Sequence, residues 1–421
     1  MAGSTIQNET ILTRVLAGIE PTIGAGGPVT FPLYGTFAGK KSRSLIRDPL
    51  MRGSYDGNYN PARGPETFDG YTYGDKLSFQ DLAILPRIGV SKPPTAVSDG
   101  FTIPGYTRAY RPSDAVFDSL VVQRGVVGMP FVTLGIQADE FTISHNGDDA
   151  SGNWMWGSNL IVVDDDMIPL FTGTTPVAAT GGSTTTIVMT TAGWTVDAHA
   201  GKYVAMRSGT VANIDNIVQI LSNTATTLTL ATALPAAVAA ADTFEISGAF
   251  TPGIADRTLD YIQNPGTQLI IADDLAGLAL TQNVINDKMI SFGVTQTNAL
   301  RSKRFSDNIG GVSKKRGRGM REVVWTIVME FDDWKEYRLF ETAYPKDRAL
   351  RVQQLNGPTI DAAAATKQTA MITSPRVQWD DIDPQGEREG NITATYAAVA
   401  YVPTAGYVVE YTSKTKLVTL P

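Results

Sequence analysis

The sequence predicts a mainly β protein with one flanking α-helix, a short second helix and a small all-β domain inserted near the middle. Three observations support this fold class. The chain has 40 glycines and 23 prolines with many threonines and valines, which favours strands and turns. Runs in which apolar and polar residues alternate recur along the chain, as is typical of half-buried strands. The composition changes near residues 172 and 249, which marks a separate module.

The overall composition limits the class of protein. The 421 residues, of which 18% are charged and 43% hydrophobic, are enough for two or three cores. Cysteine is absent, so disulfides cannot form, and His145 and His199 leave little room for histidine catalysis or zinc. A net charge of −7 argues against a free-standing nucleic-acid binder. No apolar run approaches the ~18 residues that span a bilayer, so we expect a soluble or self-assembling protein.

The stretch Glu322 to Pro345 gives the clearest local prediction. Apolar residues alternate from Val323 to Met329, which predicts a strand. Asp332 or Asp333 can then cap a helix whose aromatic face is formed by Trp334, Tyr337 and Phe340. This aromatic face requires an apolar surface to cover, and a β-sheet is the surface that the sequence offers.

The first part of the chain is predicted to contain an arm followed by half of a β domain. Residues 1–30 are expected to form the N-terminal arm, with a possible short helix at Thr10 to Leu16. Residues 31–171 are expected to form the first half of the β domain. Asp56 to Gly74 is predicted to be a long loop, because it is dense in turn-forming residues.

A second helix is predicted at Leu77 to Ile88. Ser78 and Asp81 form a capping-box-like pair at its start, and Pro86 ends it. Farther on, residues 131–136 and 141–145 are predicted to be two separate short strands.

The middle of the chain differs in composition from its surroundings. Residues 172–249 are rich in Thr, Ala and Val, and contain only Lys202 and Arg207 as basic side chains. Short alternating runs predict a small inserted β domain. We expect it to point outward and to serve decoration or weak surface adhesion.

Residues 250–421 are predicted to form the second half of the β domain. Residues 267–272 and 275–280 are expected to form a hairpin around Asp273 and Asp274. Two strands, residues 369–377 and 390–402, are expected to be joined by an acidic loop at residues 380–389.

The strongest local charge signal lies between residues 300 and 321. We interpret it first as a segment that docks on acidic parts of an adjacent copy, second as a solvated loop, and last as a phosphate-contacting arm, because the chain is acidic overall. The docking residues would be Arg301, Lys303, Arg304, Lys314, Lys315, Arg316, Arg318 and Arg321.

Known catalytic and metal motifs are absent from the sequence. There is no Gly-x-Ser-x-Gly, phosphate-binding glycine loop or His-Glu-x-x-His, so we predict no enzyme activity, no cofactor and no metal. Two acidic clusters, residues 164–166 and 380–383, lack the spacing of a calcium loop. An enzyme using a carboxylate pair is an alternative without an identifiable pair.

The order of elements in two long segments resembles that of major tail tube proteins of long-tailed bacteriophages. The run from SFGVTQTNALRSKRFSDN to LRVQQLNG resembles the C-terminal half of that family, and PRVQWDDIDPQGEREGNITATYAAVAYVPTAG resembles its ending. KLSFQDLAILPRIGV and FTIPGYTRAYRPS are similar to its N-terminal half. The likeness covers most of residues 31–168 and 250–421. The module departs from the minimal family plan and resembles Thr-rich β modules inserted in phage virion proteins.

The resemblance implies a structural protein of the virion tail, assembled in the host cytoplasm. Its core would be a β-sandwich or barrel, and copies would pair sheet edges into hexameric rings that stack into a tube. Implied partners are other copies, the tape-measure protein, tail terminator and baseplate or distal tail proteins. Double-stranded DNA would pass through the lumen without tight binding, which an acidic wall would favour; no membrane partner is implied.

An adhesin or carbohydrate-binding virion protein is the alternative from another class. Trp154, Trp156 and Trp194 would then be binding aromatics. Aromatic side chains at alternating strand positions more often fill a core, and Trp194 is expected to anchor the core of the module.

Overall fold

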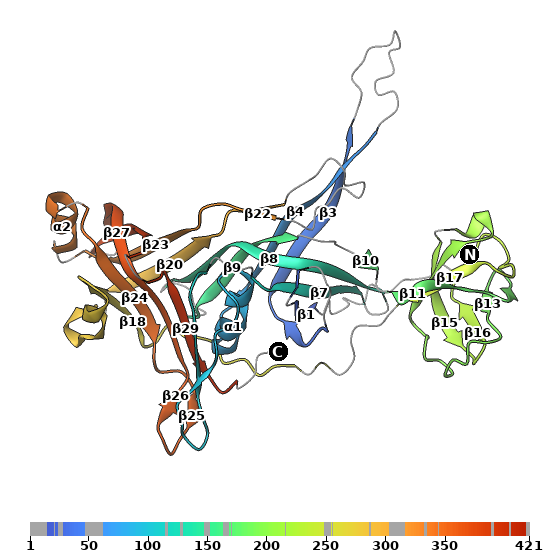
Figure 1. Cartoon of the computed structure of the whole chain (residues 1–421), viewed down its shortest axis with the longest axis horizontal. Helices are drawn as coiled ribbons and strands as arrows, with labels where there is room; N and C mark the ends of the chain where they lie inside the picture. Colours follow the sequence, from blue (N-terminus) through green and yellow to red (C-terminus); the bar gives the residue numbers. More distant parts are fainter. Residues whose placement is uncertain are drawn as a thin grey trace, which may run out of the picture.

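The computed structural model describes residues 15–20, 22–23, 28–46, 62–113, 117–126, 129–146, 152–162, 168–169, 171–214, 216–247, 254, 256–285, 288–302, 316–331, 335–343, 345–388, 391–403 and 406–417. Within these residues the protein has two α-helices and is otherwise built mainly of antiparallel strands, which confirms the mainly β fold class. Figure 1 shows an elongated molecule with the inserted module at one end.

One long antiparallel sheet connects the two halves of the chain. Its strands follow in the spatial order β3–β4–β9–β8–β20–β23–β28–β27. Their bounds are Thr36–Ile46 (β3), Ala62–Lys76 (β4), Met155–Val162 (β9), Met129–Asn146 (β8), Met289–Thr297 (β20), Glu322–Glu330 (β23), Asn391–Ala400 (β28) and Thr369–Arg388 (β27).

The long strands β8 and β27 each continue into a second group of strands. The first part of β8 pairs with β7 and β10, and β7 leads to β1 and β2. The first part of β27 pairs with β24 and β29; β24 leads to β18 and β19, and β29 to β6 and β5. The bounds are Val15–Glu20 (β1), Phe31–Leu33 (β2), Ser119–Val126 (β7), Ile168–Pro169 (β10), Thr267–Ala272 (β18), Val284–Ile285 (β19), Arg348–Gln354 (β24), Glu410–Thr415 (β29), Tyr106–Tyr110 (β6) and Val97–Ser98 (β5).

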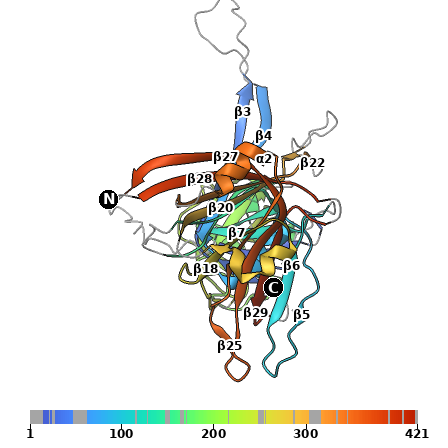
Figure 2. The same ribbon diagram turned by 90° about the vertical axis from the view of Figure 1, so that its left-hand side faces the viewer.

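Short hairpins extend from this framework. β21 (Leu300–Ser302) pairs with β22 (Arg316–Arg318), and β25 (Thr359–Asp361) pairs with β26 (Thr366–Lys367). Figure 2 shows the β3–β4 hairpin projecting from one side of the molecule and the β25 and β5 hairpins from the other.

One large hydrophobic core is shared by both halves of the chain. Alternation along the strands sends every second residue inward, so that Trp156, Phe141 and Trp325 are fully buried. The rings of Phe141 and Trp156 stack with centroids 4.7 Å apart. Burial of each large apolar side chain contributes about 1.5–3 kcal/mol, so this shared core holds the two halves together.

The predicted second helix is present as α1 (Phe79–Ile84) and a 3₁₀ turn, η1 (Leu85–Ile88). The Ser78 hydroxyl accepts a hydrogen bond from the Asp81 N–H at 2.9 Å, as the capping prediction requires. Pro86 has no N–H to continue the α-helix, so the last turn tightens. α1 is buried against β29 and β27 (Figure 1).

The predicted flanking helix is α2 (Lys335–Ala343). Tyr337 and Phe340 pack half-buried against the shared core, as their spacing predicts. The proposed cap residues Asp332 and Asp333, and Trp334, lie outside the described residues. Three further 3₁₀ turns are Val211–Asn213 (η2), Ala276–Ala279 (η3) and Thr281–Asn283 (η4).

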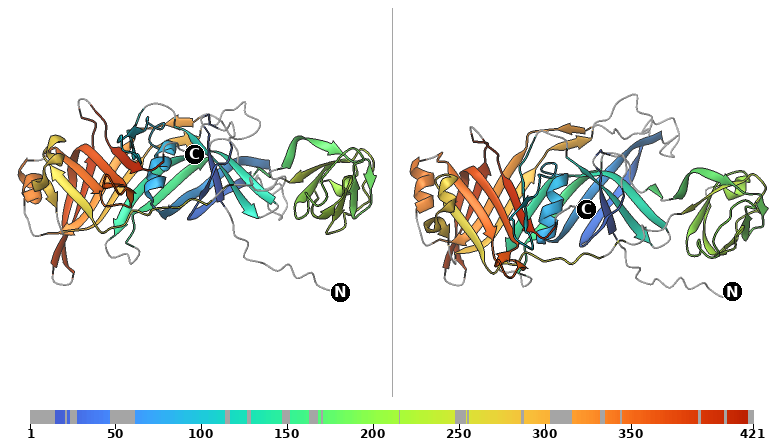
Figure 3. Two further views of the ribbon diagram at one scale, coloured as in Figure 1. Left: turned by 90° about the horizontal axis from the view of Figure 1, so that it is seen from below. Right: turned by 60° about the horizontal axis from the view of Figure 1, so that its bottom comes forward.

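The inserted module has its own sheet and its own core. Its strands follow in the order β11–β17–β14–β15–β16–β13–β12, and Ile187, Val204 and Phe244 are buried in its centre. Figure 3 shows the module beside the main body in two further views. The bounds are Phe171–Ala178 (β11), Gly181–Gly182 (β12), Thr186–Val188 (β13), Tyr203–Ser208 (β14), Ile217–Asn223 (β15), Thr227–Leu230 (β16) and Thr243–Ser247 (β17).

Several local predictions were wrong. Within the expected arm, Val15–Glu20 is strand β1, buried between β2 and β7. In the expected loop, residues 62–74 belong to strand β4. Residues 276–279 form a 3₁₀ turn, and the partner of β18 in that hairpin is β19. Residues 380–388 continue strand β27, and 131–136 and 141–145 are one strand. The possible helix at residues 10–16 lies mostly outside the described residues, and Val15 and Leu16 are strand.

Candidate assembly interface

The outward face of the long sheet carries a row of small, uncharged residues. Strand pairing places one residue from each of seven adjacent strands side by side, from β4 to β27. In order these are Gly74, Gly157, Thr142, Thr295, Val324, Val399 and Gln378. Each is half-buried or exposed, whereas their neighbours along the strands are mostly buried. The sheet therefore has one core face and one face of small side chains that is open to solvent.

The next row on this face also consists mostly of small residues, but a charged residue lies at each of its two ends. It runs through Lys76, Met155, Ser144, Gly293, Thr326, Ala397 and Asp381. The hydroxyls of Thr142 and Thr295 hydrogen-bond across neighbouring strands at 2.8 Å, so they use their polar groups within the sheet. A shallow hollow on the same face is lined by Thr72, Gly74 and Glu140, among others. Apart from Asp381, these residues carry no motif in the sequence that marks them as a site, although their alternation with apolar positions is visible there.

The two edge strands of this sheet differ in charge. β3 pairs with β4 alone in the described part of the chain, and residues 380–388 of β27 pair with β28 alone. The sequence of β3, TFAGKKSRSLI, contains Lys40, Lys41 and Arg43. The β27 segment contains Asp380, Asp381 and Asp383, all exposed. Unpaired backbone N–H and C=O groups at such edges are a template for pairing with another strand.

The structure describes part of the predicted basic docking segment. Arg301, Arg316 and Arg318 lie in the short hairpin β21–β22. Lys303, Arg304, Lys314 and Lys315 lie outside the described residues.

Arg321, the last predicted docking residue, is held within its own chain. Its Nε donates to Asn298 Oδ1 at 3.2 Å, and its Nη2 donates to the Ser113 carbonyl at 3.1 Å. The guanidinium also lies over the ring of Phe117. These contacts give Arg321 a structural role inside the subunit, and its docking role stays a prediction.

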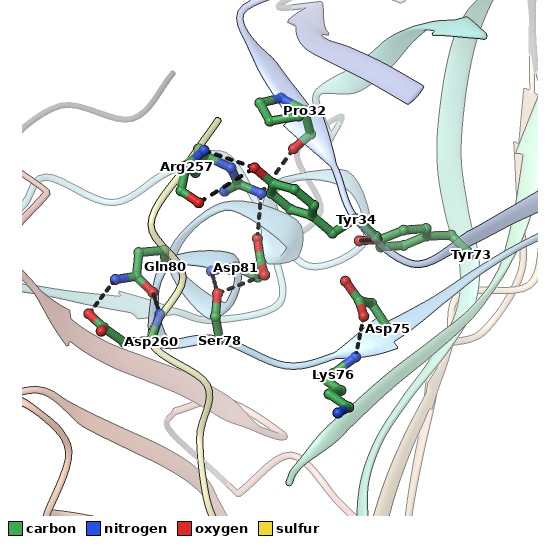
Figure 4. Close-up of polar contacts among 10 residues, drawn as sticks. All are labelled: Pro32, Tyr34, Tyr73, Asp75, Lys76, Ser78, Gln80, Asp81, Arg257 and Asp260. Carbon is green, nitrogen blue, oxygen red and sulfur yellow. Dashed lines mark hydrogen bonds and ion pairs between the residues drawn. The ribbon is translucent and has the colours of Figure 1, made fainter. Parts of the chain in front are cut away.

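A strap that returns from the module, residues 256–264, crosses α1 and ties the halves together (Figure 4). Arg257 Nη2 donates to Asp81 Oδ1 at 2.9 Å and to the Pro32 carbonyl at 3.2 Å. Asp260 and the Gln80 side chain exchange two hydrogen bonds, of 2.8 and 3.0 Å. The Ile262 N–H donates to the Leu77 carbonyl at 2.9 Å. This strap is not recognisable from the sequence, because isolated residues in a loop give no periodic signal.

The cluster under the strap perturbs a carboxyl group and a phenol. Burial, followed by the nearby Asp81, raises the pKa of Asp75 above its usual range. Its Oδ1 accepts a hydrogen bond from the Lys76 N–H at 2.7 Å, whereas its Oδ2 is buried without a hydrogen-bond partner. Burial also raises the pKa of Tyr73, whose hydroxyl donates to the Tyr34 carbonyl at 2.7 Å. This arrangement favours the protonated forms of Asp75 and Tyr73, so both side chains have a structural role.

The tryptophans and the histidine considered above for glycan or metal binding are buried or half-buried. Trp154 and Trp156 are buried in the shared core, which leaves no ring surface open to a glycan, and Trp194 packs half-buried against the core of the module. His145 is buried in β8. The described residues contain no cluster of His, Asp and Glu that could hold a metal ion, and residues 164–166 lie outside them.

Comparisons with known proteins give no assignment. No protein-family model matches this chain, and no curated protein sequence matches it. In the described part of the chain, no helix has the length and apolar character needed to cross a membrane.

Proposed function

We propose that the chain is a structural virion protein, the tail tube subunit of a long-tailed bacteriophage. Its copies join into closed rings, and the rings stack into the conduit for genome delivery. The observation that carries this proposal is the open sheet with a small-residue face and two edges of opposite charge. Edge pairing into a closed ring would satisfy the exposed backbone groups of every copy. The resemblance of residues 31–168 and 250–421 to tail tube proteins supports the same conclusion.

The face of small residues is the proposed wall of the lumen. Apart from Gln378 and Met155, the inner positions of its two rows are Gly, Ser, Thr, Ala and Val, and no basic residue occurs in the central row that would bind phosphate. Glu140 and Asp381 add negative charge near the margins of this face, and Lys76 adds one positive charge at the end of the second row. Since each neutralised phosphate increases affinity for DNA, such a wall lets DNA and the tape-measure protein pass without sticking.

The basic segment is proposed to dock on an acidic surface of a neighbouring copy. Its hairpin β21–β22 extends the β20–β23 hairpin beyond the sheet, as the ends of β3 and β4 extend theirs (Figure 1). A two-stranded ribbon is only marginally stable in water by itself, so contact with a neighbour would stabilise it.

Electron microscopy and sedimentation of the purified chain over a range of concentrations test the proposal. Rings and tubes are expected, and a chain that stays monomeric at every concentration would refute it. The variant Arg301→Glu/Arg316→Glu/Arg318→Glu is expected to block tubes. The variant Lys202→Glu/Arg207→Glu, in the module, is the control for loss of basic charge and should form tubes normally.

A further inference from the structure

The main body contains the same arrangement of strands twice. In the first half the order is β2–β1–β7–β8–β9–β4–β3, and in the second half it is β19–β18–β24–β27–β28–β23–β20. The helices α1 and α2 follow the equivalent strands β4 and β23, and the short strand β10 lies on β8 as β29 lies on β27. The chain therefore contains two copies of one unit.

The details of strand pairing support this equivalence. The β7–β8 pair has an irregularity between Leu120 and Val122, and β24–β27 has one between Arg348 and Leu350. The β8–β9 pair has a second irregularity between Ala138 and Glu140, and β27–β28 has one between Trp379 and Asp381. In each long strand these two irregularities occur at matching positions relative to the pairing, so β8 and β27 are equivalent strands with a defined register.

Within the long sheet, the two units are joined by one pair of strands, β8 and β20. Residues 140–146 of β8 pair antiparallel with residues 291–297 of β20. The equivalent of β8 is β27, and the equivalent of β20 is β3. These are the two strands that form the edges of the long sheet.

We infer that β27 of one copy pairs with β3 of the next in the way that β8 pairs with β20 within the chain, and that three copies close one ring. This inference rests on the proposed function. Transferring the β8–β20 register places residues 36–38 of β3 opposite residues 385–387 of β27, and brings the basic part of β3 beside Asp381 and Asp383. The opposite charges of the two edges fit this pairing. A hexameric ring contains six β units. Because each chain supplies two units, three copies are enough to close it, instead of the expected six copies.

The width of the ring distinguishes three copies from six. Each copy contributes eight strands, β3 to β27, to a continuous sheet. With strands about 4.8 Å apart and tilted by about 40°, three copies close a barrel roughly 50 Å across, whereas six would give roughly 100 Å. The narrower barrel leaves a lumen suited to one duplex.

Disulfide cross-linking tests the pairing directly, since the chain has no cysteine of its own. The variant Ala38→Cys/Gln385→Cys is expected to give, under mild oxidation, covalent species that end at three chains. The control variant Ala38→Cys/Gln378→Cys places the second cysteine farther back along β27, away from Ala38 of the next copy. It is expected to give no cross-linked chains. Native mass measurement of the wild-type ring is expected near 135 kDa, three times the 45.1 kDa chain.

A charge exchange provides an independent test. The variant Asp381→Lys/Asp383→Lys is expected to prevent ring formation, and adding Lys40→Glu/Lys41→Glu is expected to restore it. Rings of six copies, a ladder that continues past three chains, or no rescue would overturn the inference while the proposed function stands. Failure of the wild-type chain to form any ring would instead refute the proposed function.

Discussion

Replacing Arg257 by Met tests whether the strap holds the two halves of the chain together. Arg257 forms an ion pair with Asp81, and their side chains are 17% and 5% exposed. The substitution leaves the Asp81 carboxylate buried without its cation, and removing one partner of a buried pair costs about 3–5 kcal/mol. The main body without residues 172–247 has about 345 residues. At ~2.1 cal/mol/K of unfolding entropy per residue, its melting temperature should fall by about 4–7 °C.

A double-mutant cycle separates the ion pair from other effects of the substitution. Asp81→Asn keeps an oxygen that can accept from the Ser78 hydroxyl, so the cap of α1 persists. In Asp81→Asn/Arg257→Met no charge is left buried, and the loss should be smaller than the sum of the two single losses. Thermal unfolding by calorimetry measures the global loss. Hydrogen exchange of the Ile262 amide, which donates to the Leu77 carbonyl, reports on the strap itself.

The result that would refute this reasoning is specific. If Arg257→Met lowers the melting temperature by less than about 1 °C, or if the losses in the double variant simply add, the ion pair does not hold the strap. The control Arg207→Met breaks the more exposed ion pair with Glu245 in the module, so it should cost at most about 1 kcal/mol.

Three further predictions concern the carboxyl group under the strap, the open sheet face and the module. Because the pKa of Asp75 is raised in the folded state, its protonated form favours folding, and this contribution is lost as pH rises through the raised pKa; Asp75→Asn should therefore increase stability at pH 7 and weaken the pH dependence above about pH 4 in denaturant titrations. A Cβ added at Gly293 meets no atom within 4 Å, so Gly293→Ala should stabilise the chain by about 0.5–1 kcal/mol without altering ring formation; destabilisation would contradict an open face. Deleting residues 172–247 should leave ring formation intact, because the module has a separate core, and loss of tubes in microscopy would make the module part of the wall.

The sequence was sufficient to predict a helix or strand where the signal lies within that element itself. The alternation from Val323 to Met329 predicted β23, and Ser78 with Asp81 predicted the start of α1. These signals depend on neighbouring residues only, so tertiary contacts are not needed to read them.

Long strands were divided wrongly because irregular pairing interrupts their alternation. The shift between Ala138 and Glu140 reverses which residues face the core, so β8 looks like two short strands. The shift between Trp379 and Asp381 has the same effect in β27, where Pro384 and Gly386 also suggest a turn. In both cases the strand continues because a neighbouring strand pairs with it, and that pairing is not visible locally.

The duplication was also not visible in the sequence. Equivalent core positions of the two units are mostly buried in both units but mostly differ in residue type. In the first unit Tyr71 is paired with Leu160, and at the matching place in the second unit Trp325 is paired with Ala398; all four side chains are buried. A fold keeps the apolar character and total volume of a core more strictly than the residue types, so two such units diverge in sequence while their topology remains.

The place where the module joins the main body has a consequence for how this chain can change. Phe171 and Ser247, at the two ends of the module, are paired neighbours on adjacent strands, so the module enters and leaves through one point. Only residue 170 separates β10, in the main body, from β11. A different compact domain with adjacent termini could be grafted there without redesigning either β unit. The site is therefore a natural position for displaying a foreign domain on this protein.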